Sequence, residues 1–193
     1  MIELMEKKAN VVFVDETCFT ANQVNSNSWW KKGEPSPEYQ VNSLRFRCVA
    51  VVGAIDLQGN LVALQTDDRS IRVPQFKEFL EKLKAAVPAT PTYVLLDNLN
   101  VHHNKEVKEL AKSLGLELIF NAAYYSHVNV IERLWNYSKR AFQRKIINEP
   151  DWKNNDNIRD LVIECLKEVK PQTLAAYAET CLVTMKRDLS DLA

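Results

Sequence analysis

Two apolar segments of this chain each end in an aspartate, and this feature constrains the fold most strongly. Residues 11–14 (VVFV) precede Asp15, and residues 93–96 (YVLL) precede Asp97. An apolar run of this length is typical of a strand that is buried inside a sheet. An aspartate that follows such a strand lies at the rim of the sheet. The sequence therefore predicts two carboxylates at the end of a buried sheet.

A third acidic residue lies at the predicted start of a helix. Glu132 belongs to the segment NVIERLW at residues 129–135. Two carboxylates from strand ends and one from a helix could converge on hard cations, which take oxygen ligands. This pattern favours a metal-dependent enzyme that acts on phosphodiesters.

Each acidic residue also has a purely structural interpretation. Asp15 and Asp97 could be turn residues at strand ends, a common role for aspartate. Asn129 and Glu132 have the spacing of a capping box, in which the two side chains cap the start of the helix. Glu16 follows Asp15, so strand alternation should point it to the opposite side, and it is not expected to be a ligand.

The composition is that of an ordinary soluble domain. The chain has 193 residues, of which 46% are apolar and 26% charged, enough for a single domain with a real core. Its 25 basic residues balance 25 acidic ones, so any nucleic-acid surface must be a local patch. No segment is apolar enough to predict a membrane span or a secretory signal. The widely spaced Cys18, Cys48, Cys165 and Cys181 are expected to be reduced thiols in an intracellular protein.

The order of predicted elements indicates an α/β fold. Strands are expected at 11–15, 47–55, 61–65, 92–97 and 116–120, and helices from Pro74 to Pro88, over 105–114, from Glu132 to about 147, and near 156–169 and 171–189. A hairpin followed by βαβ alternation predicts a mixed sheet with helices on both faces. Residues 16–44 are polar and irregular and predict an inserted arm. We expect a catalytic domain over 1–150 and a helical extension, 151–193, packed on the same domain.

Three blocks of sequence carry a resemblance to a known family. The first is VDET at residues 14–17, followed by SWWKKGEP at 28–35. The second is LDNLNVH at 96–102, and the third is YYSHVNVIERLW at 124–135, followed by YSK at 137–139. In order and spacing, these blocks resemble the catalytic domain of mariner-superfamily DDE transposases and their bacterial insertion-sequence relatives. The resemblance extends over about residues 11–145.

The resemblance implies a ribonuclease-H-like fold in which Asp15, Asp97 and Glu132 are the catalytic residues and bind two Mg²⁺ or Mn²⁺ ions. Two such ions stabilise the attacking and leaving oxygens of an in-line displacement at phosphorus. The implied function is that of a DNA endonuclease and strand transferase, which cuts and joins the phosphodiesters of a mobile element. Its partners would be transposon-end and target DNA and a second copy of the chain. The implied compartment is the cytoplasm or nucleoid of a bacterium, or a eukaryotic nucleus.

Further residues surround the predicted site. Asn98 and His102 are expected to support the metal ligands without binding the metal. Heptad spacing predicts a basic stripe after Glu132 on the same helix, where a DNA backbone would lie. The DNA-binding candidates are Lys31, Lys32, Arg133, Lys139 and Arg140, and the candidates for gripping a second subunit are Trp29 and Trp30. Packing of the tryptophans on the sheet and simple solvation of the helix face are the alternatives.

The chain departs from the family pattern in two respects. The third block usually carries prolines where this chain has Ala122, Ser126 and Val130, so the approach to Glu132 is expected to be less rigid. Only ten residues precede Val11, so the helix-turn-helix modules that family members carry are not expected here. An alternative function is therefore a non-catalytic remnant that dimerises with an intact transposase or regulates it. An acid-nucleophile phosphatase would need a second aspartate at position 17, which holds Thr17.

Overall fold

The fold is built around one mixed five-stranded sheet. The computed structural model describes residues 1–20, 32–33, 48–88, 91–122, 128–148 and 155–191. The strands are β1 (Val11–Phe19), β2 (Val49–Asp56), β3 (Leu61–Asp67), β4 (Thr92–Leu96) and β5 (Leu116–Phe120), in the order β3-β2-β1-β4-β5. The first three strands are antiparallel neighbours, whereas β4 is parallel to both β1 and β5. The predicted mixed sheet is confirmed.

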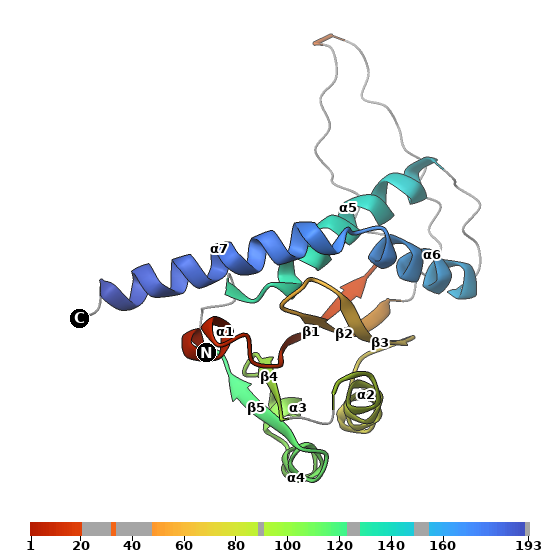
Figure 1. The fold of residues 1–193 in the computed structure, drawn as a ribbon. Coiled ribbons are helices and arrows are strands. Elements are labelled where there is room, and N and C mark those ends of the chain that lie inside the picture. Colours follow the sequence, from red (N-terminus) through yellow and green to blue (C-terminus); the bar gives the residue numbers. More distant parts are fainter. Residues whose placement is uncertain (21–31, 34–47, 89–90, 123–127, 149–154, 192–193) are drawn as a thin grey trace.

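Helices cover both faces of this sheet. They are α1 (Ile2–Glu6), α2 (Val73–Ala86), α3 (Asn100–His103), α4 (Lys105–Ser113), α5 (Ile131–Asn148), α6 (Asn155–Lys167) and α7 (Pro171–Ser190). Figure 1 shows α5, α6 and α7 on one side of the sheet, and α2 and α4 on the other. The predicted arrangement of flanking helices is therefore confirmed.

The alternation of side chains along β1 divides the core into two parts. Val11 and Phe13 pack with apolar residues of α5, α6 and α7, whereas Val12 and Val14 pack against α2 and α4. These four β1 side chains are buried, so the strand is covered on both faces. This explains why its sequence is continuously apolar, and it places Asp15 on the α5 side of the sheet and Glu16 on the other.

Most local sequence signals correspond to real element boundaries. Pro74 lies in the first turn of α2, and α4 is followed by Gly115, whose φ of +69° is the left-handed conformation typical of a residue after a helix. Two short helices, α1 and α3, were not predicted, because neither is long enough to show helical periodicity. Formation of α3 follows from a turn in which the Leu99 N–H donates to Oδ1 of Asp97 at 3.0 Å.

The first strand is longer than predicted. It runs to Phe19, and Glu16 and Thr17 pair with Val52 and Val51 of β2. The arm predicted from residue 16 therefore begins after β1 has ended. The polar residues of this extension hid it, because they interrupt the continuous apolar pattern that identifies the buried part of β1. Most of the predicted arm, including Trp29, Trp30 and Lys31, lies outside the described residues.

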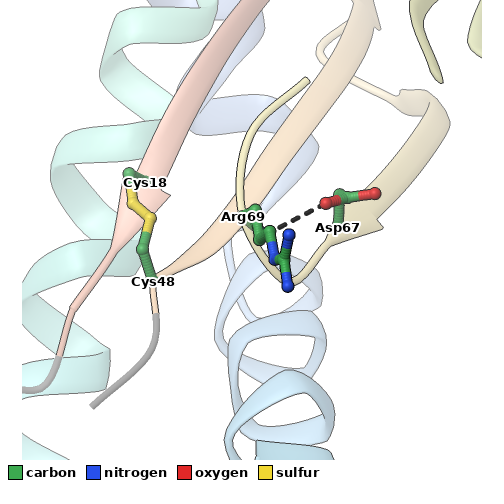
Figure 2. The surroundings of a disulfide bond; sticks show 4 residues. All are labelled: Cys18, Cys48, Asp67 and Arg69. Carbon is green, nitrogen blue, oxygen red and sulfur yellow. Dashed lines mark hydrogen bonds between the residues drawn. A yellow bond between two sulfur atoms is a disulfide. The ribbon is translucent and has the colours of Figure 1, made fainter. Parts of the chain in front are cut away.

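The structure corrects the prediction that all four cysteines are free. Cys18 and Cys48 form a disulfide with a Cα–Cα separation of 6.1 Å, as Figure 2 shows. Near this bond, the backbone N–H of Arg69 donates to Oδ1 of Asp67. The prediction failed because Cys48 lies next to β2, and the pairing of β2 with β1 brings together two cysteines that are 30 positions apart. Cys165 and Cys181 form no disulfide, and both are buried.

None of the helices in the described part of the chain has an apolar stretch that could cross a membrane.

Candidate metal centre

Parallel pairing of β1 with β4 brings the two aspartates to the same end of the sheet. Phe13 pairs with Leu95, so the residues two positions further along each strand are Asp15 and Asp97. Both strands run in the same direction, so the two aspartates lie at the same end of the paired segment, although β1 continues past Asp15 to Phe19. Asp97 directly follows the last residue of β4, as predicted, whereas the prediction that Asp15 ends its strand is wrong.

Helix α5 brings Glu132 to the same rim. The helix packs on β1 and β2, and the indole Nε1 of Trp135 donates a buried 3.0 Å hydrogen bond to Oδ2 of Asp15. The strand next to β1 makes room for this indole at Gly53, which pairs with Asp15. A Cβ atom at Gly53 would lie 2.9 Å from the ring of Trp135. Glu132 lies one turn before Trp135 on the helix, next to the two aspartates.

The acidic side chains influence one another electrostatically. Asp15 has only 8% of its surface exposed. Burial, followed by the negative charges of Glu132 and Glu16, raises the pKa of Asp15 from 3.8 to about 7. The raised pKa means that the ionised form of Asp15 is unfavourable at this position, and a nearby cation would stabilise it.

The other two carboxyl groups differ in their electrostatics. Burial raises the pKa of Glu132, with Lys139 opposing this change and Asp97 adding to it. For Asp97, burial also favours the neutral acid, but hydrogen bonds from His102 and from the Leu99 N–H outweigh it, and the pKa is lowered. Asp97 therefore ionises at a lower pH than a free aspartate, whereas Asp15 and Glu132 ionise at a higher pH than free carboxyl groups of their kind.

The capping-box interpretation of Asn129 and Glu132 is wrong. The side-chain Oδ1 of Asn129 is buried and has no hydrogen-bond partner among the residues that the structure describes, so it does not cap the helix. Its Nδ2 instead faces the backbone oxygen of Val14 at 3.5 Å. Asn129 thus ties the start of α5 to β1, which leaves the Glu132 carboxylate outside any cap.

His102 lies between two carboxylates. Its Nδ1 is 3.0 Å from Oδ1 of Asp97, and its Nε2 is 2.9 Å from Oε1 of Glu16. Burial opposes a charged ring, but the hydrogen bonds to Asp97 and Glu16 outweigh it and raise the pKa of His102 to about 10. Among the described residues, ligand atoms from Glu16, Asp97 and His102 all lie within 4.8 Å of one another, and Asp15 and Glu132 lie outside this group.

The second predicted supporting residue, Asn98, contacts the neighbouring strand. Its Nδ2 donates to the backbone oxygen of Asn121 at 2.7 Å, and its Oδ1 lies 3.3 Å from Nε2 of His103. These contacts tie the end of β4 to the residue after β5. His103 itself is exposed and stacks on Phe120.

Basic residues of α5 lie next to the acidic group. Lys139 is close enough to act on the pKa of Glu132, and Arg140 beside it is exposed. Arg133 is also exposed, and its guanidinium lies over the rings of Tyr137 and Tyr177 at 5.1 and 5.2 Å. Of the two predicted arm lysines, Lys32 is described and exposed. A hollow of about 780 Å³ lies elsewhere, between β5 and α4, and none of the three acidic candidates lines it.

Sequence reasoning missed two residues of this site. Trp135 was not among the expected site residues, because nothing in a single sequence shows that an indole N–H will donate to Asp15. Glu16 was excluded as a ligand because it points to the opposite face, and it does so. Its contact with His102 depends on α3, whose position after β4 the sequence did not reveal. The adjacent acidic pair Asp15-Glu16 was the available signal.

Comparison with known proteins decides the family. Residues 10–153 match the model of the DDE superfamily endonucleases. The chain belongs to the DDE superfamily endonuclease family. A search of curated proteins found no match.

Solved structures of transposases share the fold of this family member. The Mos1 transposase paired-end complex with left transposon end matches with a TM-score of 0.71 at 16% identity, over 95% of this chain and 58% of that one. The Mos1 strand transfer complex matches with a TM-score of 0.73 at 14% identity, over 98% and 57%. The Mos1 catalytic domain with Raltegravir gives 0.61 at 14% identity with Mg and 0.59 at 13% identity with Mn, in both cases over 95% of this chain and 88% of that one.

These similarities confirm the predicted ribonuclease-H-like fold. The present chain spans less than two thirds of the length of the Mos1 chains in the two DNA complexes. Nothing in the comparisons or in the described residues favours the non-catalytic remnant. The roles of Asp15, Asp97 and Glu132 in catalysis stay a prediction, which the geometry of the rim supports.

Proposed function

We propose that this chain is the catalytic domain of a mariner-type DDE transposase, which cuts DNA at the ends of a mobile element and joins them to a target. The observation that most supports this proposal is the electrostatic influence of Glu132 on Asp15 and of Asp97 on Glu132, at one end of a ribonuclease-H-like sheet. The chain's membership of an endonuclease family supports the same chemistry.

The three carboxylates would hold Mg²⁺ or Mn²⁺. Their donor atoms are all oxygens, which suits hard divalent cations. Asp15 and Glu132 also repel each other when both are ionised, and bound cations would relieve this repulsion. When bound, two ions would stabilise the charge on the attacking and leaving oxygens of a displacement at phosphorus.

The proposed reaction has two phosphoryl-transfer steps. Attack of water on a phosphodiester breaks the bond between phosphorus and the 3′ oxygen, which leaves a 5′ phosphate and a 3′-hydroxyl group. That hydroxyl then attacks a phosphodiester of the target and displaces a new 3′ oxygen. In both steps, the residues of this chain fix the geometry: Trp135 orients Asp15, and the turn after β4 orients Asp97.

DNA would lie along the exposed side of α5. Lys139, Arg140 and Arg133 would contact phosphates close to the acidic rim, together with Lys32 and Lys31 of the arm. The two tyrosines beside Arg133 would hold its guanidinium in place. We further propose a homodimer, with Trp29 and Trp30 gripping the second copy, and an intracellular location, where DNA is the available substrate.

A plasmid-nicking assay tests the proposed function. Purified protein is incubated with supercoiled plasmid and Mn²⁺ or Mg²⁺, and the conversion to nicked circles is measured for the natural chain and for Asp97→Asn. Cutting by the natural chain, absent without metal and absent in Asp97→Asn, supports the proposal. DNA binding without cutting by the natural chain would favour a remnant, and equal cutting by Asp97→Asn would exclude the assigned site.

A further inference from the structure

The contact between His102 and Glu16 links the two faces of the sheet at the acidic rim. Glu16 lies on the opposite face of β1 from Asp15, and His102 belongs to the short helix α3 that follows β4. The imidazole is fully buried, and each of its nitrogens faces a carboxylate. One carboxylate, Glu16, belongs to β1, and the other, Asp97, follows β4. A chain of contacts therefore runs from Glu16 through His102 to Asp97.

The His102 ring is held by an aromatic neighbour and by polar contacts at both nitrogens. The ring of Phe76 from α2 packs against it, with the ring centroids 4.7 Å apart. Nδ1 also lies 3.2 Å from the backbone oxygen of Asp97, and an oxygen of this kind can only accept a hydrogen bond. Asp97 at Nδ1 and Glu16 at Nε2 thus orient the plane of the ring through contacts at its two nitrogens.

Glu16 has no described partner that would compete with His102. Its Oε1 contacts His102, and its buried Oε2 has no hydrogen-bond partner within the described chain. A buried carboxylate oxygen without a partner is costly. The fold retains it, and this points to a task for Glu16 beyond its own stability.

The fixed ring in turn orients Asp97. Oδ1 of Asp97 accepts a hydrogen bond from the Leu99 N–H and is 3.0 Å from Nδ1 of His102. No described residue forms a hydrogen bond with Oδ2, so this second oxygen is directed by the other two contacts and is available to a cation. Partners that orient a ligating carboxylate in this manner commonly matter for metal affinity.

We propose that Glu16 is a positioning residue that acts through His102 to hold the Asp97 carboxylate in its metal-binding orientation. This inference rests on the proposed function, in which Asp97 is a metal ligand. In this role, Glu16 contacts neither the metal nor the DNA. Its effect should therefore appear in metal affinity and in turnover, with little change in the binding of DNA.

The same three side chains could be interpreted as a metal site of their own, because their ligand atoms lie within 4.8 Å. The geometry of the ring argues against this. The two nitrogens of an imidazole point in opposite directions, and each is already used by a different acceptor. A single ion could contact only one of them and would displace a hydrogen bond to do so.

The experiment compares Glu16→Gln, Glu16→Ala, His102→Gln and the double variant Glu16→Ala with His102→Gln. Mn²⁺ affinity is measured by calorimetry, and nicking kinetics give kcat and the KM for DNA. Glu78→Gln is the matched control, because Glu78 pairs with Lys82 on α2, away from the rim. A glutamine at position 16 can still accept from Nε2, whereas an alanine cannot.

We expect Glu16→Ala to weaken Mn²⁺ binding and lower kcat by about 10- to 100-fold, with the KM for DNA within about twofold of the natural value. Glu16→Gln should recover most of this loss, and the double variant should be no worse than His102→Gln alone. Natural kcat and Mn²⁺ affinity in Glu16→Ala would overturn the proposal. So would equal losses in the alanine and glutamine variants, or a change confined to KM.

Crystal structures of metal-free Glu16→Ala and Glu16→Gln, each compared with that of the natural chain, separate this inference from the proposed function. The inference predicts that Nδ1 of His102 moves away from Oδ1 of Asp97 in the alanine variant and stays close in the glutamine variant. An unchanged contact in Glu16→Ala would overturn it, whether or not the protein cuts DNA. Absence of metal binding in the natural chain would instead contradict the proposed function.

Discussion

Nε1 of Trp135 donates a 3.0 Å hydrogen bond to Oδ2 of Asp15, across 120 positions of sequence. Both groups are buried, and Gly53 opposite Asp15 leaves the space that the indole occupies. This hydrogen bond favours the ionised carboxylate, whereas burial and two neighbouring negative charges favour the acid. Asp15 is therefore held in one orientation while its charge is kept unfavourable, a combination that suits a residue waiting for a cation.

Replacing Asp15 with asparagine should stabilise the metal-free protein at pH 8. The pKa of Asp15 is 3.8 when unfolded and about 7 when folded, so the folded state binds more protons between these values. The free energy of unfolding of the natural chain consequently falls as the pH rises from about 4 to 7, and the loss persists above 7. Asp15→Asn is free of this loss and keeps an acceptor for Trp135.

The gain at pH 8 should be at most about 4 kcal/mol and should largely disappear at pH 4. Urea unfolding at several pH values, with EDTA present, measures it. Adding Mn²⁺ should then raise the stability of the natural chain but not that of Asp15→Asn. Equal stability of the two proteins across the pH range would contradict the assigned electrostatics of Asp15.

Asp97→Asn should have the opposite effect on stability. Asp97 pairs with a buried histidine, His102, and an asparagine would lose this ion pair. Because the pKa of Asp97 is lowered, its ionised form stabilises the fold above the usual aspartate pKa, and this contribution is lost as the pH falls through the lowered value. The neutral amide of Asp97→Asn lacks this stabilising contribution at every pH.

Asp97 is partly exposed, so solvent screening limits the loss to about 1 kcal/mol or less. Thermal melting at pH 7 should show a lower melting temperature for Asp97→Asn than for the natural chain, together with the complete loss of nicking activity. A variant that is inactive but clearly more stable than the natural chain would show that His102 does not depend on Asp97.

Opening the disulfide should destabilise the fold. Cys18 and Cys48 are 30 positions apart, and a cross-link that closes a loop of this length stabilises a protein by roughly 3–4 kcal/mol in the chain-entropy model. Cys48→Ser should reduce the free energy of unfolding by about this amount under oxidising conditions. Cys181→Ser, at a cysteine that forms no disulfide, serves as the control for loss of a thiol.

The same experiment under reducing conditions provides an internal check. A reductant should lower the stability of the natural chain to that of Cys48→Ser and leave Cys48→Ser itself unchanged. Intracellular reductants would have this effect in a cytosol. If the reductant does not alter the stability of the natural chain, the disulfide contributes nothing to the fold.

Neutralising basic residues of α5 should weaken DNA binding and reduce its dependence on salt. Lys139→Gln and Arg140→Gln each remove one proposed phosphate contact. Each should lower the slope of log K against log salt concentration by about 1, without a preference for DNA sequence. Fluorescence anisotropy with labelled duplex DNA over a salt series measures this slope. Lys105→Gln, on α4, is the control, and an equal change in this control would contradict the proposed path of the DNA.

Much of the fold could be predicted because its signals are local. The apolar runs of β1 and β4, the hairpin of β2 and β3, and Gly115 after α4 all follow from short-range patterns. Three acidic residues at the ends of such elements also indicated the site. These features need no knowledge of long-range contacts.

The remaining features depend on contacts between distant segments. The Trp135–Asp15 hydrogen bond spans 120 positions, and the His102–Glu16 contact spans 86. The disulfide depends on how β1 pairs with β2. A single sequence contains no signal for such pairings, because each follows from the register of strands and from the packing of α3 and α5. Trp135 and Glu16 were therefore missed, whereas Asn98 and His102 were expected beside the site, and the roles of the three acidic candidates stay a prediction.

The most direct test is a crystal of the protein soaked in Mn²⁺ and measured at a wavelength where manganese scatters anomalously. The account predicts anomalous density between the carboxylates of Asp15, Asp97 and Glu132, with Glu16 and His102 outside the coordination distance of about 2.2 Å. Density against Glu16 and His102, or a soaked crystal with no density near Asp15 and Glu132, would contradict it.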